Sequence, residues 1–137
     1  MRPHWTDGFS EDLKRTLRNW NMRPQSAKAK GRRLQQWTRD QLIEHLMISD
    51  EDVESRSMGA GGEDLIMAKE ARRKFPYSIE CKNVEKVNVW EAMEQAKANA
   101  KKGEPLVIIK RNNSKPLAIV DAEFFIKQHM PTTTEDL

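Results

Sequence analysis

The sequence predicts an α/β domain in which helices flank a mixed central β-sheet. Short apolar runs, one of them strictly alternating, are typical of strands, and they are interspersed with segments whose apolar residues recur at helical spacing. The resulting order of helix, strands, helix, strand, strand and helix favours this class over a bundle or a barrel. With 137 residues, 37% hydrophobic and 33% charged, the chain suits one small domain. We expect that domain over residues 26–130, between a helical basic N-terminal arm (1–25) and a disordered tail (131–137).

The arm is predicted to carry one short helix. Ser10 is a favourable N-cap, and the helix reaches about Trp20. Leu17 lies one helical turn and Leu13 two turns before Trp20, so the three share one face. We therefore expect this helix to dock, either on its own domain or on a partner chain.

A basic run at residues 25–33 leads into a second predicted helix, which reaches about Ile48. At 100° per residue, Gln35 shares its direction with Leu42 and Leu46. Gln35 is therefore expected to point into the domain.

Three strands are predicted after this helix. An edge strand at residues 53–58 is followed by a glycine turn at 59–62 and a strand at 64–67. The third, at 76–82, places Tyr77, Ile79 and Cys81 on one face and Ser78, Glu80 and Lys82 on the other. The segment before it is expected to be a loop with four basic side chains, for which DNA contact and simple solubility are equally favoured: Lys69, Arg72, Arg73 and Lys74.

The next helix is predicted to begin at Asn88, with Glu91 at the third position as in a capping box. Its apolar stripe consists mostly of small residues, which favours close packing on a sheet: Val89, Ala92, Met93, Ala96 and Ala100. Strands at 106–109 and 117–120 follow, joined by a polar turn, and Asp121 is expected to cap a last short helix.

One set of side chains carries the chemistry. Glu80 and Lys82 are two residues apart on one strand and project from the same face, where Asp64 of the preceding strand can join them. Two close carboxylates repel each other unless a cation lies between them. Mg²⁺ suits such a site, because it accepts two carboxylates, a main-chain carbonyl and phosphate oxygens while retaining waters.

Gly61-Gly-Glu-Asp64 followed by Ile79-Glu-Cys-Lys82 resembles the signature of the PD-(D/E)xK nuclease superfamily, and Gln95 on the following helix adds to the likeness. The resemblance covers about residues 28–121. It implies a restriction-endonuclease-like core with the order helix, three strands, helix, strand. Archaeal-type Holliday junction resolvases and phage recombination nucleases are small members of this superfamily.

Carried over by position, the resemblance implies that Asp64, Glu80 and the main-chain carbonyl of Cys81 bind the metal. Lys82 would orient or deprotonate the attacking water, and Gln95 would position water, metal or Lys82. Two further residues are expected as accessories. Gln35 stands where many members carry a glutamate, which leaves open whether one metal or two bind, and Glu63 adjoins Asp64.

The function that follows is that of a Mg²⁺-dependent DNA endonuclease, with Mn²⁺ as a substitute and no small-molecule cofactor. We expect a homodimer that cuts branched or Holliday-junction-like DNA during recombination, repair or phage DNA processing. Seven basic residues are expected to contact DNA phosphates: Lys28, Lys30, Arg32, Arg33, Lys110, Arg111 and Lys115. Trp37 and Trp90 are expected to pack within the domain, because each lies in a helix.

Two alternatives come from a different functional class. Residues 104–125 are similar to the strand-turn-strand-helix of Phd/YefM-type antitoxins, which are non-catalytic DNA-binding repressors. A nuclease fold that has lost catalysis and serves as a DNA-binding module is the other, and the neutral Gln35 keeps it open.

Composition excludes several other classes. The net charge is only +3, which argues against a uniformly basic protein that coats nucleic acid. The positive charge is concentrated in residues 11–39, which hold nine basic side chains and two acidic ones. No apolar run is long enough to span a membrane, and the first residues lack the apolar segment of a secretory signal peptide. We therefore expect a cytoplasmic protein of a bacterial or phage-infected cell. A single cysteine and three scattered histidines make a His/Cys metal site improbable.

Overall fold

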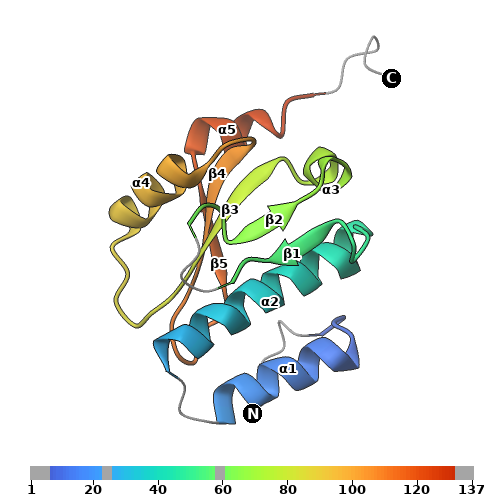
Figure 1. The fold of residues 1–137 in the computed structure, drawn as a ribbon, viewed down its shortest axis with the longest axis vertical. Coiled ribbons are helices and arrows are strands. Elements are labelled where there is room, and N and C mark those ends of the chain that lie inside the picture. Colours follow the sequence, from blue (N-terminus) through green and yellow to red (C-terminus); the bar gives the residue numbers. More distant parts are fainter. Residues whose placement is uncertain (1–6, 23–25, 58–60, 132–137) are drawn as a thin grey trace.

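The computed structural model describes residues 7–22, 26–57 and 61–131. The chain forms an α/β fold with a three-stranded mixed sheet, a two-stranded antiparallel sheet and flanking helices (Figure 1). In chain order the elements are α1 (Glu11–Met22), α2 (Ala27–Leu46), β1 (Val53–Ser55), β2 (Leu65–Met67), α3 (Lys69–Lys74), β3 (Tyr77–Asn83), α4 (Val89–Asn99), β4 (Glu104–Lys110), β5 (Leu117–Val120) and α5 (Ala122–Lys127). The predicted class, with its mixed sheet, is confirmed.

The larger sheet has the strand order β3-β4-β5. β3 and β4 are parallel and connected through α4, whereas β4 and β5 form an antiparallel pair. β1 and β2 pair as an antiparallel hairpin beside β3. One main-chain hydrogen bond, from the Asp64 N–H to the Ile79 carbonyl at 3.0 Å, joins the end of this hairpin to the free edge of β3.

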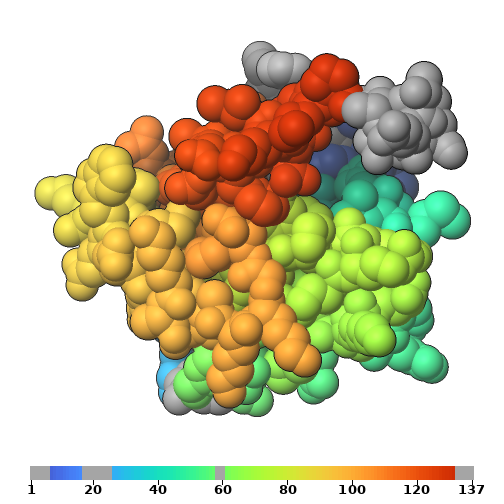
Figure 2. Space-filling view, turned by 90° about the horizontal axis from the view of Figure 1, so that it is seen from above, coloured from blue at the N-terminus to red at the C-terminus, as the bar shows by residue number. Residues whose placement is uncertain are grey.

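Two apolar clusters lie on the two faces of the larger sheet. On one face, Ile79 and Cys81 of β3 pack with buried leucines of α2, as the alternation along β3 predicts. On the other face, the small residues Ala92 and Ala96 of α4 pack on Val107 of β4. Glu80 lies opposite Val107 in the strand register, so it belongs to the face that α4 covers. Figure 2 shows α4 and α3 on opposite sides of the molecule, with α5 lying across the end between them.

The predicted helix caps are confirmed. The side chains of Ser10, Asn88 and Asp121 each accept a hydrogen bond from the N–H three residues later, at 3.1, 3.1 and 2.9 Å. Ser26 caps α2 in the same way. α2 ends at Leu46, two residues before the predicted end, because Met47 takes a left-handed conformation with φ of 54°.

α1 packs on α2 of its own domain, which is one of the two alternatives that the sequence left open (Figure 1). Leu13 is buried, and the Ser10 N–H donates to the Glu44 carboxylate at 3.0 Å. Phe9 lies against His45 with 5.9 Å between ring centroids. The side chains of residues 17–22 lie outside the part described.

Two expectations about packing were wrong. The basic segment before β3 is not a loop but the short helix α3, because Ala71 is buried in the core and Glu70 pairs with Arg73 along the helix. Trp90 does not pack within the domain: it is 83% exposed, since two residues of helix turn it away from the sheet-facing Ala92. Trp37 does pack against the core, as expected.

None of the helices in the described ranges has the length and apolar composition that a membrane span requires. The expected turn at 59–62 falls partly outside those ranges, and the predicted tail falls outside them from residue 132 onward.

Candidate active site

Asp64 lies where the β1–β2 hairpin meets the edge of β3. Its N–H donates to the Ile79 carbonyl, and its Oδ2 accepts a hydrogen bond from the Cys81 N–H at 2.7 Å. Ile79 and Cys81 are two residues apart, so their main-chain groups point to the same edge of the strand. The two bonds therefore fix the Asp64 carboxylate against β3.

Glu80 lies on the face of β3 that α4 covers, and only 5% of it is exposed. Its Oε2 accepts a hydrogen bond from the Asn99 Nδ2 at 3.3 Å. Its Oε1 lies 3.7 Å from the Nζ of Lys82, which is half-buried on the same strand face. The two charged residues of the predicted motif thus form an ion pair beneath α4.

The two carboxylates are electrostatically strained. Burial raises the pKa of Glu80, and the nearby charge of Asp64 raises it further, while Asn99 and Lys82 oppose the shift. Burial likewise raises the pKa of Asp64 against the opposing Cys81 N–H, Lys82 and Arg56. Ionising both carboxyl groups therefore costs free energy, and a bound cation would reduce that cost.

The oxygen atoms present fit a hard divalent cation. Besides the Asp64 and Glu80 carboxylates, the carbonyl of Cys81 points to the Asp64 edge, because the N–H and C=O of one strand residue point the same way. Within the part of the chain that the structure describes, no three His, Cys, Asp or Glu side chains gather. A Mg²⁺ ion here would take two carboxylates and a carbonyl from the protein and its other ligands from water or substrate.

We expect Mg²⁺ and Mn²⁺ to raise the melting temperature at pH 7.5, by roughly 5 °C at ten times the dissociation constant. Because the folded-state pKa values of Asp64 and Glu80 are raised, the stability of the metal-free protein should fall as pH rises through those values. Protons compete with the cation, so its stabilising effect should shrink at lower pH. Differential scanning fluorimetry across pH 5–8 measures both trends.

Asp64→Asn sharpens this test. The asparagine oxygen can still accept the Cys81 N–H, but one of the two repelling charges is gone. Without metal, the variant should have a higher melting temperature than wild type, because its free energy of unfolding is about 1 kcal/mol larger. Mg²⁺ and Mn²⁺ should no longer raise that melting temperature. Glu94→Gln, on the exposed side of α4, is the matched control. An undiminished cation shift in Asp64→Asn would contradict this site.

Lys82 and Gln95 line one shallow hollow of about 160 Å³, together with residues of the loop after β3. The structure thus brings Gln95 to the same hollow as Lys82, on the exposed side of α4. The α4 residue that contacts Glu80 is instead Asn99, one helical turn further on. The sequence analysis missed Asn99. Its position, four residues after Gln95 and three after the buried Ala96, places it on the side of α4 that faces the sheet, which was a usable signal.

Gln35 is buried, as its predicted inward direction requires, and its Oε1 accepts a hydrogen bond from the Ser55 hydroxyl at 2.7 Å. This contact joins α2 to β1. Glu63 is buried as well, and its carboxylate forms an ion pair with Arg72 at 3.1 Å. Both accessory candidates therefore have contacts that hold the hairpin in place.

The seven basic candidates divide by location. Lys28 and Arg32 line a hollow of about 440 Å³ with Arg56 and with polar residues of α2 and the segment after β1. Arg56 also acts electrostatically on Asp64, so this hollow adjoins the candidate site. Lys30 and Arg33 are half-buried on α2, and Arg111 and Lys115 belong to the β4–β5 turn.

Lys110 does not stand on the surface as expected. It is only 7% exposed, and its Nζ donates to the Arg111 carbonyl at 3.0 Å. The reason is the strand register, because Lys110 follows Leu106 and Ile108 on the face of β4 that α2 covers. Burial lowers the pKa of Lys110, while Glu85 opposes that shift.

Comparison of the chain with models of protein families, with curated proteins and with solved structures finds no significant match. The case for a function therefore depends on the contacts of Asp64, Glu80 and Lys82.

Proposed function

We propose that the protein is a divalent-cation-dependent DNA endonuclease with the restriction-endonuclease-like core of the PD-(D/E)xK superfamily. The observation that carries the proposal is the Asp64 carboxylate on the Cys81 N–H, beside the Glu80–Lys82 pair of the same strand. The chain order α2, β1, β2, α3, β3, α4, β4 supports it, because apart from the short helix α3 this is the helix, three strands, helix, strand order of that superfamily. The parallel pairing of β3 with β4 through α4 fits as well.

The proposed reaction is hydrolysis of a phosphodiester. A bound Mg²⁺ would supply a Lewis acid for the phosphate and lower the pKa of a coordinated water. Water attacks phosphorus in line, the bond to the 3′ oxygen breaks, and a proton passes to that oxygen, which leaves 5′-phosphate and 3′-hydroxyl ends. Lys82 stabilises the negative charge that develops on the phosphate, and its ion pair with Glu80 holds the ammonium group at the site.

DNA is the proposed substrate because cationic side chains adjoin the site. The hollow lined by Lys28, Arg32 and Arg56 lies next to Asp64, where the flanking phosphates of a bound strand would pass. Branched or junction DNA, cut by a homodimer with one site on each strand, is the form we propose for recombination, repair or phage DNA processing.

A second candidate function is non-catalytic DNA binding. β4, β5 and α5 form the strand-turn-strand-helix arrangement that favours the antitoxin-like alternative. The neutral, hydrogen-bonded Gln35 favours an inactive nuclease fold. Either alternative leaves the strained acids Asp64 and Glu80 without a role.

Cleavage assays separate these candidates. Plasmid, linear duplex, single-stranded and four-way-junction DNA are each incubated with Mg²⁺, Mn²⁺ or EDTA. The proposal expects cutting that depends on the cation and is lost in Lys82→Ala. Binding without cleavage of any substrate would rule out the nuclease and favour a binding module.

Arg32→Glu should weaken DNA binding by removing a phosphate contact, because Arg32 is exposed and lines the basic hollow. We expect the slope of log affinity against log salt to become shallower by at least about one. Lys97→Glu, an exposed change on α4 outside this hollow, is the control. Fluorescence anisotropy in EDTA between 50 and 200 mM salt measures both, and equal slopes for Arg32→Glu and wild type would refute the contact.

A further inference from the structure

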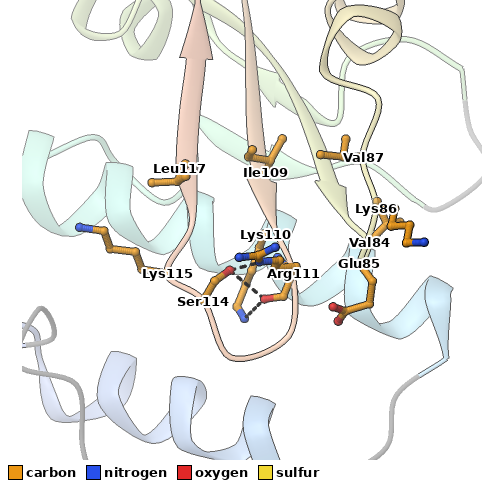
Figure 3. Close-up of a pocket in the computed structure, with 10 residues that line it drawn as sticks. All are labelled: Val84, Glu85, Lys86, Val87, Ile109, Lys110, Arg111, Ser114, Lys115 and Leu117. Carbon is orange, nitrogen blue, oxygen red and sulfur yellow. Dashed lines mark hydrogen bonds between the residues drawn. The ribbon is translucent and has the colours of Figure 1, made fainter.

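A second hollow, of about 470 Å³, lies at the end of the sheet where β3 and β4 finish (Figure 3). It is lined by residues 84–87 of the loop after β3 and by residues on both sides of the β4–β5 turn. We call it the end pocket. The carboxyl ends of parallel strands are the usual place for ligands in open α/β sheets, and this volume is within the range of small-molecule sites.

The floor of the end pocket is apolar. Ile109 of β4 and Leu117 of β5 are directly opposite each other in the strand register, and Figure 3 shows them in a row with Val87. Leu117 is 53% exposed and Val84 41% exposed. α4 is about 16 Å long whereas β4 is about 23 Å long, so the helix leaves this end of the sheet uncovered.

The sides of the end pocket are cationic. Lys86 and Lys115 stand at opposite sides of it, and Lys110 and Arg111 lie at the turn between them (Figure 3). The pocket includes one carboxylate, that of Glu85, which accepts a hydrogen bond from the Asn112 N–H at 2.8 Å. An apolar floor with a cationic border suits a ligand that joins a flat apolar group to an anion.

The end pocket is continuous with the candidate active site. The hollow that holds Lys82 and Gln95 shares three lining residues with it: Val84, Lys86 and Val87. A strand whose phosphate lies at Lys82 can therefore follow the loop after β3 into the end pocket.

We propose that the end pocket receives an unpaired nucleotide of the DNA substrate, with its base on the apolar floor and its phosphates at the cationic border. This inference rests on the proposed nuclease function and names its substrate class, DNA with a single-stranded segment beside the cut. A paired base is stacked inside the duplex and cannot reach such a pocket, whereas an unpaired base can be buried against apolar side chains.

The test measures binding in EDTA, where no cleavage occurs, by fluorescence anisotropy. The probes are a blunt 20-base-pair duplex and the same duplex with five unpaired nucleotides on one strand. We expect the tailed duplex to bind about tenfold more tightly, as burial of a single base predicts. Leu117→Glu, which places a negative charge on the floor, should remove this preference and leave the affinity for the blunt duplex within about twofold.

Ile126→Glu is the matched control, because it adds the same charge at an exposed apolar position of α5, at the other end of the sheet (Figure 1). It should retain the preference. Circular dichroism melting confirms that both variants fold. Equal binding of blunt and tailed duplexes by the wild type, or a preference that survives Leu117→Glu, would overturn the inference.

Two further arms separate the possible explanations. A deoxynucleoside monophosphate that competes as strongly as the tailed duplex would identify a free-nucleotide site and overturn the role in DNA recognition. Cleavage of both duplexes in Mg²⁺ without any binding preference would refute the proposed role of the end pocket but support the nuclease function. A binding preference in EDTA without cleavage in Mg²⁺ would refute the nuclease function but support the role of the end pocket.

Discussion

Asp64→Asn is expected to lower the rate of Mg²⁺-dependent DNA cleavage by at least about a hundredfold, and Lys82→Ala by a similar factor. Asp64 supplies one of two carboxylates to the candidate metal site, and the amide that replaces it carries no charge. The hydrogen bond to the Cys81 N–H can survive in the amide, so the loss will not come from a misplaced hairpin. Initial rates on the preferred substrate, at saturating Mg²⁺, measure the effect.

Glu63→Gln is the matched control for this prediction. Glu63 adjoins Asp64 in the chain, but its carboxylate is bound to Arg72 rather than held against β3. At a temperature where the variant stays folded, its cleavage rate should remain within about threefold of wild type. Equal losses in Asp64→Asn and Glu63→Gln would mean that hairpin stability, and not metal binding, accounts for both.

Arg72→Ala is expected to lower the free energy of unfolding by about 3 kcal/mol, the usual cost of removing one partner of a buried ion pair. The Arg72 side chain is only 17% exposed. Its Nη1 donates to the carbonyls of Tyr77 and Lys102, and its Nη2 donates to Glu63. The residue thus ties α3 to β3, to the segment before β4 and to the hairpin.

Urea unfolding, followed by tryptophan fluorescence, measures this prediction. Arg73→Ala is the control, since Arg73 is exposed and forms its ion pair with Glu70 of its own helix. The change in unfolding free energy should stay within about 0.5 kcal/mol. Arg72→Lys should rescue little, because one ammonium group cannot replace a guanidinium that donates in three directions. If Arg72→Ala and Arg73→Ala have equal effects, the network around Arg72 does not stabilise the fold.

Local signals in the sequence predicted most elements. Ser10, Asn88 and Asp121 mark helix starts that the structure confirms, because a cap depends on the N–H three residues away. The alternation along β3 correctly separated Ile79 and Cys81 from the face that carries Glu80 and Lys82. These predictions held because each depends on neighbours within one turn or one strand.

Some errors and omissions concern contacts between segments far apart in the chain, and others concern local signals that the predictions did not use. α3 belongs to the second kind, because its residues are strong helix formers and Glu70 pairs with Arg73 one turn later, while Ala71 anchors the helix on the core. Asn99 reaches Glu80 only because α4 crosses back over β3 to enter β4. Lys110 is buried because it lies on the face of β4 that α2 covers, together with Leu106 and Ile108. The outward direction of Trp90, like the helix α3, could have been predicted locally, since helical geometry relative to Ala92 indicates it.

The sequence by itself determined the α/β class, most of the elements and the pairing of Glu80 with Lys82 on one strand face. It did so because periodicity and capping act over a few residues. Only the tertiary structure decided that Asp64, seventeen residues before Cys81, is hydrogen-bonded to it, and that the end pocket continues from Lys82. Those contacts depend on how the hairpin and α4 pack on β3, and burial of side chains across the whole domain, rather than local preference, selects that packing.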